Sequence, residues 1–333
     1  MNKKLVSIVV SAYNEAENID ELYRRLADTV ALLESLSFEL IFVNDGSTDA
    51  TLKKITCLQI GLTSGILPHA PIHNIKIINL NRNFGHEIAM TAGMDNADGD
   101  AVIFMDADLQ HPPGYIVQMV EEWRHGADIV LTKRIDNEGI SGIYKFVSAF
   151  FYKILNFLSD VNIPEKTPDF RLLDRKYIDF LKNFNERDRM FRGLLSWIAP
   201  SDNKVKVIDF VAPKRFAGKT KYTFSKSLRL AIDAILQFST RPLRIAIWFG
   251  IITAVFSLIL GIWVIVEHYI LSNPTPGYAT TIVAITFVGS VQLIVLGIMG
   301  EYIGKIHLEV KKRPLYFAEI INRKIENNEK NNS

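Results

Sequence analysis

The chain has 333 residues, 48% of them hydrophobic, which is enough apolar material for the core of one large domain or two ordinary ones. Its formal net charge of +2 at pH 7 is close to neutral and argues against a protein that binds nucleic acid through its overall charge. The single cysteine, Cys57, excludes an internal disulfide and fits a reducing compartment.

The first part of the chain alternates short apolar runs with amphipathic stretches, a pattern typical of a mostly parallel α/β sheet. The apolar run at residues 5–10 is too short for the core of a signal peptide and indicates a first buried strand instead. The expected strands are residues 6–10, 39–43, 76–79, 102–105 and 128–131, and the expected helices are residues 16–36, 50–60, 86–96 and 113–125.

Polar motifs follow three of these strands, and ligands of open parallel sheets bind at the carboxyl ends of the strands. After the first strand, Tyr13 could stack on a base and Glu15 could accept hydrogen bonds from it; alternatively, Asn14 and Glu15 cap the next helix. After the second strand, Asp45 could accept a hydrogen bond from a uracil N–H or a ribose hydroxyl, while a hydroxyl of residues 47–48 could cap a helix.

Asp106 and Asp108 directly follow the fourth expected strand, with one alanine between them. A carboxylate pair in this place can hold one hard divalent cation, Mg²⁺ or Mn²⁺, against the phosphates of a nucleotide. Acidic residues also close strands because they solvate a turn, so the pair alone leaves both interpretations open. The convergence of three such motifs on one sheet edge favours a bound nucleotide and metal, and it indicates nucleotide-sugar chemistry.

Two apolar runs near the carboxyl end predict a pair of membrane spans. Residues 245–266 form an uncharged run of about 22 residues, which at about 1.5 Å per residue can cross ~30 Å of hydrocarbon. Residues 282–299 form a second run that contains three polar side chains and small residues suited to close helix packing. The alternative is a pair of buried core helices in a soluble domain.

The charges that flank these runs predict their orientation. Arg241 and Arg244 precede the first run and four basic residues follow the second, whereas the connector, residues 267–281, has neither lysine nor arginine. By the positive-inside rule both termini face the cytoplasm, with a short loop outside. We expect a cytoplasmic domain at residues 1–240, a plasma-membrane hairpin at residues 241–304 and a basic cytoplasmic tail at residues 305–333.

These motifs resemble one known family over nearly the whole chain. The family comprises the GT-A fold glycosyltransferases of family 2, and within it the polyprenyl-phosphate glycosyltransferases related to bactoprenol glucosyltransferase and dolichol-phosphate mannose synthase. The segments that carry the resemblance are SAYNE, VNDGSTD, LNRNFGHEIAMTAGMDNADGD, DADLQHPP, DFRLLDRK, RMFRGLLSW and EYIGKIHLEVKKRPLY.

The resemblance implies inverting transfer of a hexose from a nucleotide sugar, with UDP-glucose as the first choice, to a polyprenyl phosphate such as undecaprenyl phosphate. The product would be a lipid-phosphate sugar for modification of cell-envelope glycans such as lipopolysaccharide. The roles it implies are Tyr13, Glu15 and Asp45 on the nucleotide, Arg82 near the nucleotide sugar, Asp106 between nucleotide and metal, and Asp108 as a direct metal ligand.

Asp169 and Arg171 correspond to a motif on the acceptor side of the resembling family. A lipid phosphate is anionic at neutral pH and is itself a competent nucleophile, so the reaction requires no strong base. Asp169 would orient the acceptor or remove a residual proton, and Arg171 would bind a phosphate through its forked guanidinium. The alternative interpretation of this pair is a surface ion pair within a strand.

Further cations precede the membrane runs, and they could bind an anionic lipid headgroup or the diphosphate that leaves. Nonspecific attraction to the leaflet is the alternative. The resemblance implies that residues 218–222 form a loop that closes over the site. The candidates for acceptor or diphosphate binding are Arg171, Arg192, Arg215, Lys219 and Lys221.

Two amphipathic segments, residues 143–158 and 224–238, combine aromatic residues with lysines, and we expect them to lie in the membrane interface rather than in the soluble core. The chain also departs from the family pattern in three places. Ser11 stands where proline is frequent, Asn44 where a first aspartate is frequent, and His111 where an acidic residue is frequent. Asn44 leaves Asp45 as the carboxylate that could contact a base at that turn.

The sequence is compatible with more than one function. The same reaction could use N-acetylhexosamine, mannose or aminoarabinose as the donor sugar, and related proteins suggest a homo-oligomer. A processive polysaccharide synthase is disfavoured because the chain has no QxxRW motif. A non-catalytic membrane scaffold is disfavoured because the carboxylates at the strand ends are intact.

Overall fold

A computed structural model describes residues 3–64, 72–135, 167–184, 186–187, 189–200, 204–213, 239–269 and 277–322. The chain divides into two compact units. The first consists of Met1–Ala149, Ile163–Tyr222 and Arg313–Ser333, and the second of Phe150–Asn162 and Thr223–Lys312. The expected amphipathic segments at residues 143–158 and 224–238 lie outside the described residues, so they stay predictions.

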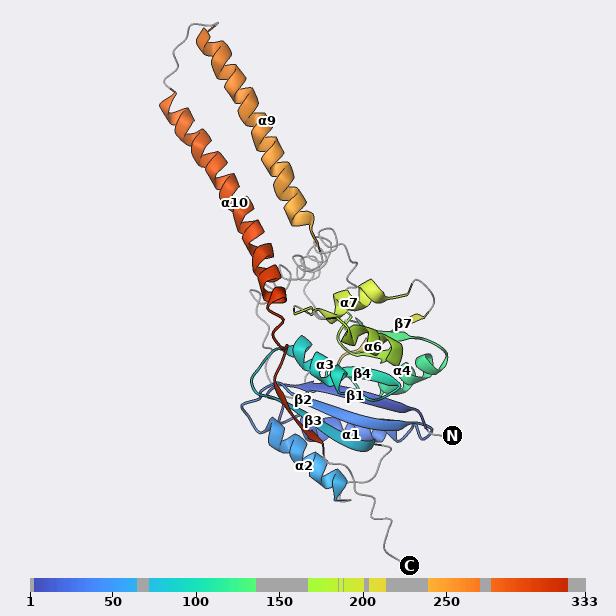
Figure 1. The fold of residues 1–333 in the computed structure, drawn as a ribbon. Coiled ribbons are helices and arrows are strands. Elements are labelled where there is room, and N and C mark those ends of the chain that lie inside the picture. The colour runs from blue at the N-terminus through green and yellow to red at the C-terminus, as the bar shows by residue number, and fades with distance from the viewer. Residues whose placement is uncertain are drawn as a thin grey trace, which may run out of the picture. The chain divides into compact units, whose positions relative to one another are not determined.

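An eight-stranded, mostly parallel sheet forms the centre of the first unit, in the order β7-β5-β6-β4-β1-β2-β3-β8 (Figure 1). The central strands pair in parallel, while β6 runs antiparallel to β4 and β5, and β8 runs antiparallel to β3. The strands are β1 (Leu5–Ala12), β2 (Ser37–Asn44), β3 (Ile72–Leu80), β4 (Ala101–Asp106), β5 (Ile129–Ile135), β6 (Arg171–Asp174), β7 (Val205–Val211) and β8 (Ala318–Asn322).

Helices pack against both faces of the sheet. Alternate residues of the central strands, such as Val6 and Ile8, belong to one apolar cluster together with residues of three helices, α1, α2 and α4. Another helix, α3, packs on β1 and β2 without joining that cluster. The helices of this unit are α1 (Ile19–Val30), α2 (Thr51–Thr63), α3 (His86–Asp95), α4 (Tyr115–Arg124), α6 (Arg175–Lys182) and α7 (Phe191–Ile198).

The five predicted strands and the four predicted helices between them are confirmed, with shifted ends. The largest difference is at the first helix, which was expected over residues 16–36 but ends at Val30. Leu33 and Leu36 continue the apolar pattern and are buried in the core cluster, although they lie in the turns that lead to β2. Because these two leucines are buried, the apolar pattern of the sequence continues beyond the end of the helix.

Among the described residues, three strands were not predicted. β6 has four residues and begins with a buried arginine, Arg171, and β7 is exposed at alternate positions. β8 lies in the expected carboxyl-terminal tail and pairs with β3 along the edge of the sheet. Tyr316, just before β8, donates a hydrogen bond from its Oη to Asp95 Oδ2 (3.0 Å) at the end of α3.

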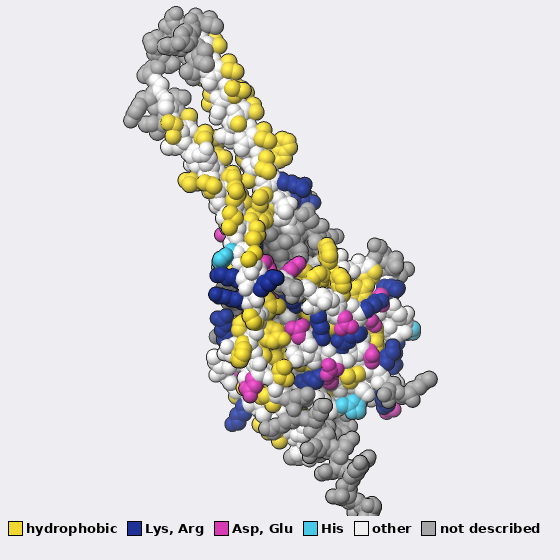
Figure 2. Space-filling model, viewed as in Figure 1, with side chains coloured by type: hydrophobic (Ala, Val, Ile, Leu, Met, Phe, Trp, Pro, Cys, Tyr) yellow, Lys and Arg dark blue, Asp and Glu magenta, His cyan; other side chains and the backbone are white. Residues whose placement is uncertain are grey.

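The second unit contains two long apolar helices, α9 (Arg241–Tyr269) and α10 (Tyr278–Val310). Both are long and apolar enough to cross a membrane, with mean hydropathy of 2.5 over Arg241–Trp263 and 2.1 over Val283–Val310. The buried share of the most apolar stretch is 6% in α9 and 0% in α10. The core helices of a soluble domain would be mostly buried, so this alternative does not fit. Large hydrophobic side chains are exposed along both helices, and Figure 2 shows those on one face.

Candidate active site

The loops that follow β1 and β2 are tied together by hydrogen bonds at the carboxyl edge of the sheet. The backbone N–H of Asn14 donates to Ser47 Oγ (2.9 Å), and Asn14 Oδ1 accepts from the N–H of Thr48 (2.8 Å). Asn18 and Ala50 precede the helices α1 and α2, and neither makes a side-chain cap. The alternatives that Asn14 and Glu15 cap the first helix and that a hydroxyl of residues 47–48 caps the second are wrong. The residues that directly precede these helices are Asn18 and Ala50, and the side chains of Asn14 and Ser47 form hydrogen bonds between the two loops instead.

Tyr13 and Glu15 lie in the first of these loops, and both are partly exposed. Glu15 is held from two sides, since its Oε2 accepts from Asn18 Nδ2 (2.6 Å) and its N–H donates to Thr51 Oγ1 (2.9 Å). A partly exposed carboxylate that a hydrogen bond holds in place fits contact with a nucleotide. The roles of Tyr13 and Glu15 on the base stay predictions.

Asp45 organises the loop that follows β3. Its carboxylate is 3% exposed and accepts hydrogen bonds from the N–H groups of Phe84 (2.7 Å) and Gly85 (3.0 Å). Burial raises the pKa of this carboxyl above its usual value, and the two N–H groups oppose that effect without cancelling it. Asp45 therefore fixes the backbone at residues 84–85, a role that sequence reasoning missed, and its predicted contact with the base is untested.

The turn after β2 also packs tightly on the same loop. Gly46 has φ +63°, and a Cβ added there would lie 2.2 Å from the backbone carbonyl carbon of Arg82. The guanidinium of Arg82 lies 4.6 Å from the centre of the Phe84 ring, and its side chain is exposed at this edge. Arg82 is thus placed where a ligand at the sheet edge can reach it, as its predicted role near the nucleotide sugar requires.

Asp106 is the last residue of β4, which lies next to β1 in the sheet, and it leads into a turn. Residues 106–111 are called the Asp106 turn below. Ser11 Oγ donates to Asp106 Oδ1 (3.0 Å), and the side chain of Asp106 is 34% exposed. Burial alone would raise the pKa of Asp106, but the charge of nearby His86 and the Ser11 hydrogen bond hold it below its usual value. Asp108 is buried and accepts a hydrogen bond from the N–H of Gln110 (3.0 Å), so it also organises the turn.

His111 supports this turn from behind. Its ring is 5% exposed and stacks on Phe170, with 5.2 Å between ring centres and 8° between planes. Burial lowers the pKa of His111, so the imidazole is neutral and its Nδ1 accepts a hydrogen bond from the N–H of Asp106 (3.0 Å). In the sequence, His111 stands out only as a departure from the family pattern, and no role was predicted for it.

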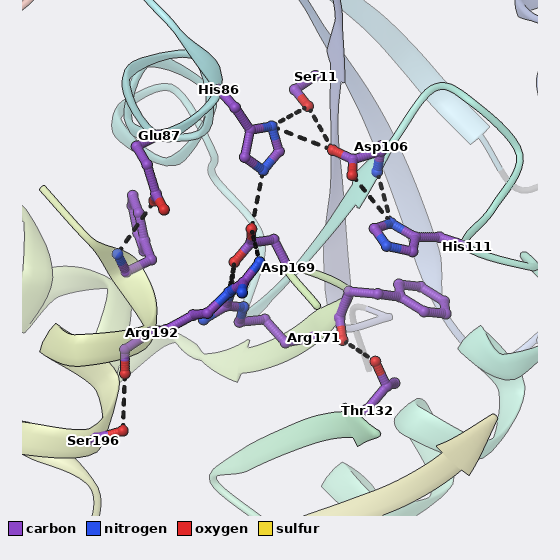
Figure 3. A network of polar contacts seen from close by, with 12 residues as sticks. Ser11, His86, Glu87, Asp106, His111, Thr132, Asp169, Arg171, Arg192 and Ser196 are labelled. Carbon is purple, nitrogen blue, oxygen red and sulfur yellow. Dashed lines mark hydrogen bonds and ion pairs between the residues drawn. The ribbon is translucent and has the colours of Figure 1, made fainter. Parts of the chain in front are cut away.

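Asp169 lies across the site from Asp106, at the centre of a network of cations (Figure 3). Arg192 donates to it from Nη2 (3.1 Å) and Nε (3.4 Å), and Arg171 forms an ion pair with it. The side chains of Asp169 and Arg171 are 5% and 3% exposed, so the alternative of a surface ion pair is wrong. Burial, followed by the nearby charge of Arg192, lowers the pKa of Arg171 to about 9, which leaves it cationic at neutral pH.

A small pocket of about 60 Å³ adjoins the two arginines. Its walls are mostly apolar, and its lining includes Ile129, Leu131, Arg171, Arg192, Leu195 and Val205. The buried Nε of Arg171 has no hydrogen-bond partner within the part of the chain that the structure describes. A buried cationic donor without a partner beside an apolar wall suits a ligand with an anionic head and a hydrophobic body.

His86 joins the two sides of the site (Figure 3). It is the first residue of α3, and its Nδ1 lies 3.0 Å from Ser11 Oγ and 3.3 Å from Asp106 Oδ1. Its Nε2 lies 3.2 Å from Asp169 Oδ2. The sequence assigned no role to His86, because nothing in its local pattern shows that α3 begins between two carboxylates.

The remaining cations near the site are not all free to bind a ligand. Arg189, three residues before Arg192, donates to the backbone carbonyls of Phe184 and Glu186, so it holds its own loop in place. Arg215, Lys219 and Lys221 lie outside the described residues, as does the predicted closing loop at residues 218–222, so their roles stay predictions. No three His, Cys, Asp or Glu side chains gather into a metal-binding cluster within the described ranges.

The model of glycosyl transferase family 2 matches residues 7–181, which is more than half of the chain. The chain belongs to this family. The model of the GtrB C-terminal hairpin also matches, over residues 241–306, which include α9 and most of α10. The predicted family, the GT-A fold with two apolar carboxyl-terminal helices, and the glycosyltransferase class are therefore confirmed.

Several relatives of this family 2 glycosyltransferase match along nearly their whole length. A prophage-derived bactoprenol glucosyl transferase of Shigella flexneri is 38% identical over 94% of this chain and 97% of its own. A prophage bactoprenol glucosyl transferase homolog of Escherichia coli is 37% identical over 96% and 99%. An uncharacterized glycosyltransferase of Synechocystis is 42% identical over 94% of each chain.

Proposed function

We propose that this glycosyltransferase transfers glucose from UDP-glucose to a polyprenyl phosphate, with inversion at the anomeric carbon. The observation that carries the proposal is the opposition of two polar centres across one site. The Asp106 turn lies on one side, and Asp169 with two guanidiniums lies on the other. The first suits a donor diphosphate with its metal, and the second suits an anionic acceptor. The names of the Shigella and Escherichia coli relatives support the choice of glucose and of the lipid.

On the donor side, Tyr13, Glu15 and Arg82 line the accessible sheet edge beside the loop that Asp45 fixes. In the proposed complex, Tyr13 packs on the base, Glu15 and Asp45 accept hydrogen bonds from the nucleoside, and Arg82 lies near the sugar diphosphate. Carboxylate acceptors and an aromatic face select a nucleoside by hydrogen bonding and stacking.

A divalent cation fits the proposed donor site. Asp106 presents a partly exposed carboxylate whose lowered pKa keeps it ionised, and metal ligands must be deprotonated. Asp106 and Asp108 offer the hard oxygen ligands that Mg²⁺ and Mn²⁺ prefer, with the diphosphate supplying further oxygens. When bound, the cation would stabilise the negative charge that develops on the leaving diphosphate.

On the acceptor side, Arg171 and Arg192 would bind the lipid phosphate, and the apolar pocket wall would receive the first part of the lipid chain. A phosphate oxygen attacks the anomeric carbon and forms the new carbon–oxygen bond. The bond to the diphosphate breaks, and UDP leaves with the electron pair. Asp169 orients the two arginines and the acceptor, and the arginines stabilise the charge in the transition state.

The proposed setting is the plasma membrane, because α9 and α10 are candidate spans and the lipid acceptor is confined to a bilayer. We propose that the sheet unit and both termini face the cytoplasm, where nucleotide sugars are available. The excess of lysine and arginine beside the spans supports this orientation. Assembly into a homo-oligomer is part of the proposal and rests only on the resemblance of the sequence motifs to the family.

The test is a transfer assay with the full chain in detergent or proteoliposomes. The protein is incubated with undecaprenyl phosphate, a divalent cation and radiolabelled UDP-glucose, and the lipid is then extracted and counted. Parallel reactions contain UDP-N-acetylglucosamine, GDP-mannose or UDP-aminoarabinose. We expect radiolabel in the lipid when UDP-glucose is the donor. Radiolabel from a different donor would change the proposed sugar but would support the same type of reaction. No labelled lipid from any donor would refute the proposal, and no thermal shift with any nucleotide would support a scaffold.

A further inference from the structure

The side chain of His86 connects two carboxylates that the proposed reaction uses for different substrates. One edge of its ring faces Ser11 and Asp106 on the donor side, at 3.0 and 3.3 Å from Nδ1. The opposite edge faces Asp169 on the acceptor side, at 3.2 Å from Nε2. An imidazole ring is rigid, so these contacts set the separation of the two carboxylates.

Hydrogen bonds hold the backbone that carries His86. Gly85, just before it, gives its N–H to the buried carboxylate of Asp45, which anchors the backbone where α3 begins. Within α3, the N–H of Ala89 donates to the carbonyl of Gly85 (3.0 Å), which continues the helix from this point. The ring therefore has a fixed base, and its contacts can hold other groups in place.

The environment of His86 differs from that of a histidine that fills a core. Its side chain is 32% exposed, and its ring makes polar contacts at both nitrogens. A core histidine would be enclosed by apolar groups, and its loss would be felt mainly as lost stability. Contacts to two carboxylates at an open edge act instead on the geometry of the site.

We propose that His86 is a positioning residue for glycosyl transfer, which holds the acceptor-side carboxylate Asp169 in register with Asp106. Asp169 in turn orients Arg171 and Arg192, so His86 aligns the proposed phosphate-binding groups with the donor. Displacement of a reacting group by about 1 Å can cost about 100-fold in rate, so this alignment is consequential. The inference rests on the proposed function, because it assigns Asp169 to the acceptor.

The test compares His86→Ala and His86→Gln with the matched control His125→Gln in the full chain. His125 is exposed at the end of α4, away from the residues of this network. Rates are measured with whichever donor sugar the unaltered protein uses, so failure of glucose as the donor does not affect the comparison. UDP affinity in the presence of the divalent cation is measured separately by calorimetry.

We expect His86→Ala to lower kcat for transfer about 100-fold, with UDP affinity changed less than about threefold. His86→Gln keeps one amide that can donate to a carboxylate, so we expect it to lose only about tenfold. His125→Gln should match the unaltered protein. Rates near normal in both His86 variants would overturn the proposal, and so would an equal loss of UDP affinity and transfer, which would place His86 on the donor alone.

A double-mutant cycle distinguishes a positioning role of His86 from a purely structural one. If His86 acts through Asp169, the double variant His86→Ala/Asp169→Asn should be no slower than Asp169→Asn alone. Independent roles would multiply the two losses, and that result would refute the inference. If His86→Ala fails to fold, the cycle is run with His86→Gln, and the same two outcomes decide. If the unaltered protein shows no transfer with any donor, the proposed function is refuted instead.

Discussion

The Nδ1 atom of His111 accepts a hydrogen bond from the backbone N–H of Asp106 at 3.0 Å, so a neutral imidazole holds the residue that ends β4. This contact explains how a buried histidine fits directly behind two carboxylates. The backbone N–H of Asp106 would lose this partner without the ring nitrogen of His111.

Replacement of His111 by phenylalanine should therefore destabilise the protein. The ring stack on Phe170 is retained, but the N–H of Asp106 loses its acceptor, which costs about 1–3 kcal/mol for a buried donor. Chemical denaturation of the full chain in detergent measures the free energy of unfolding. A His111→Gln variant, whose amide oxygen can accept, is the control. Equal stability of the phenylalanine variant and the natural protein would contradict this account.

Replacement of Asp108 by alanine should abolish metal-dependent transfer but leave membrane insertion intact. Loss of one electrostatic stabiliser of the transition state typically lowers kcat by about 100- to 1000-fold. Transfer is measured over a range of Mn²⁺ concentrations, and membrane insertion is measured by carbonate extraction. Asp209→Asn, an exposed acid on β7, is the matched control and should be fully active. Full activity of the Asp108 variant would remove this residue from the metal site.

Replacement of Gly46 by alanine should be more harmful than replacement of Gly126. Both glycines have positive φ, +63° and +97°, so alanine strains the backbone at each by about 1–2 kcal/mol. A Cβ at Gly46 also meets the backbone of Arg82 at 2.2 Å, whereas a Cβ at Gly126 meets nothing within 4 Å. We expect the Gly46 variant to melt at a lower temperature than the Gly126 variant and to bind UDP more weakly. Equal melting temperatures and UDP affinities of the two variants would show that the backbone at Arg82 can move aside for the added methyl group.

The attachment of the carboxyl-terminal strand should depend on pH through Tyr316. Burial raises the pKa of its phenol, and the adjacent carboxylate of Asp95 raises it further. The folded protein then keeps this proton at a pH where the unfolded chain releases it. The contribution of Tyr316 to stability is complete below about pH 10 and declines as pH rises through the raised pKa. Thermal melting between pH 8 and 11 should show this decline, and Tyr316→Phe should reduce it; an unchanged slope would contradict it.

The α/β architecture was predictable because the central strands are buried on both faces and so form continuous apolar runs. The edge strands escaped prediction for a physical reason. β6 contains Arg171, whose burial depends on an ion pair with Asp169 that the local sequence does not reveal. β8 pairs with β3, although their residues lie more than two hundred positions apart in the chain, so its identity as a strand depends on a distant partner.

The same distinction applies to the site. Asp106 and Asp108 were recognisable because they end an apolar strand, and Asp169 with Arg171 because their motif resembles a family. Ser11, His86 and His111 act through contacts made across the fold, which residue type and spacing do not encode. Asp45 was found for a contact with the base, while its contact with the loop at residues 84–85 became visible only in three dimensions.

The position of β8 in the chain has a consequence for biosynthesis. This strand follows both apolar helices in sequence, yet it pairs with β3 in the sheet of the first unit. The ribosome releases it only after the apolar hairpin has emerged, so β3 must remain an open edge throughout translation of the preceding segment. An open edge strand is prone to pair with other chains. Maturation of the enzyme therefore includes a late step in which β8 pairs with β3, and a protein truncated before β8 would leave the edge of β3 unpaired.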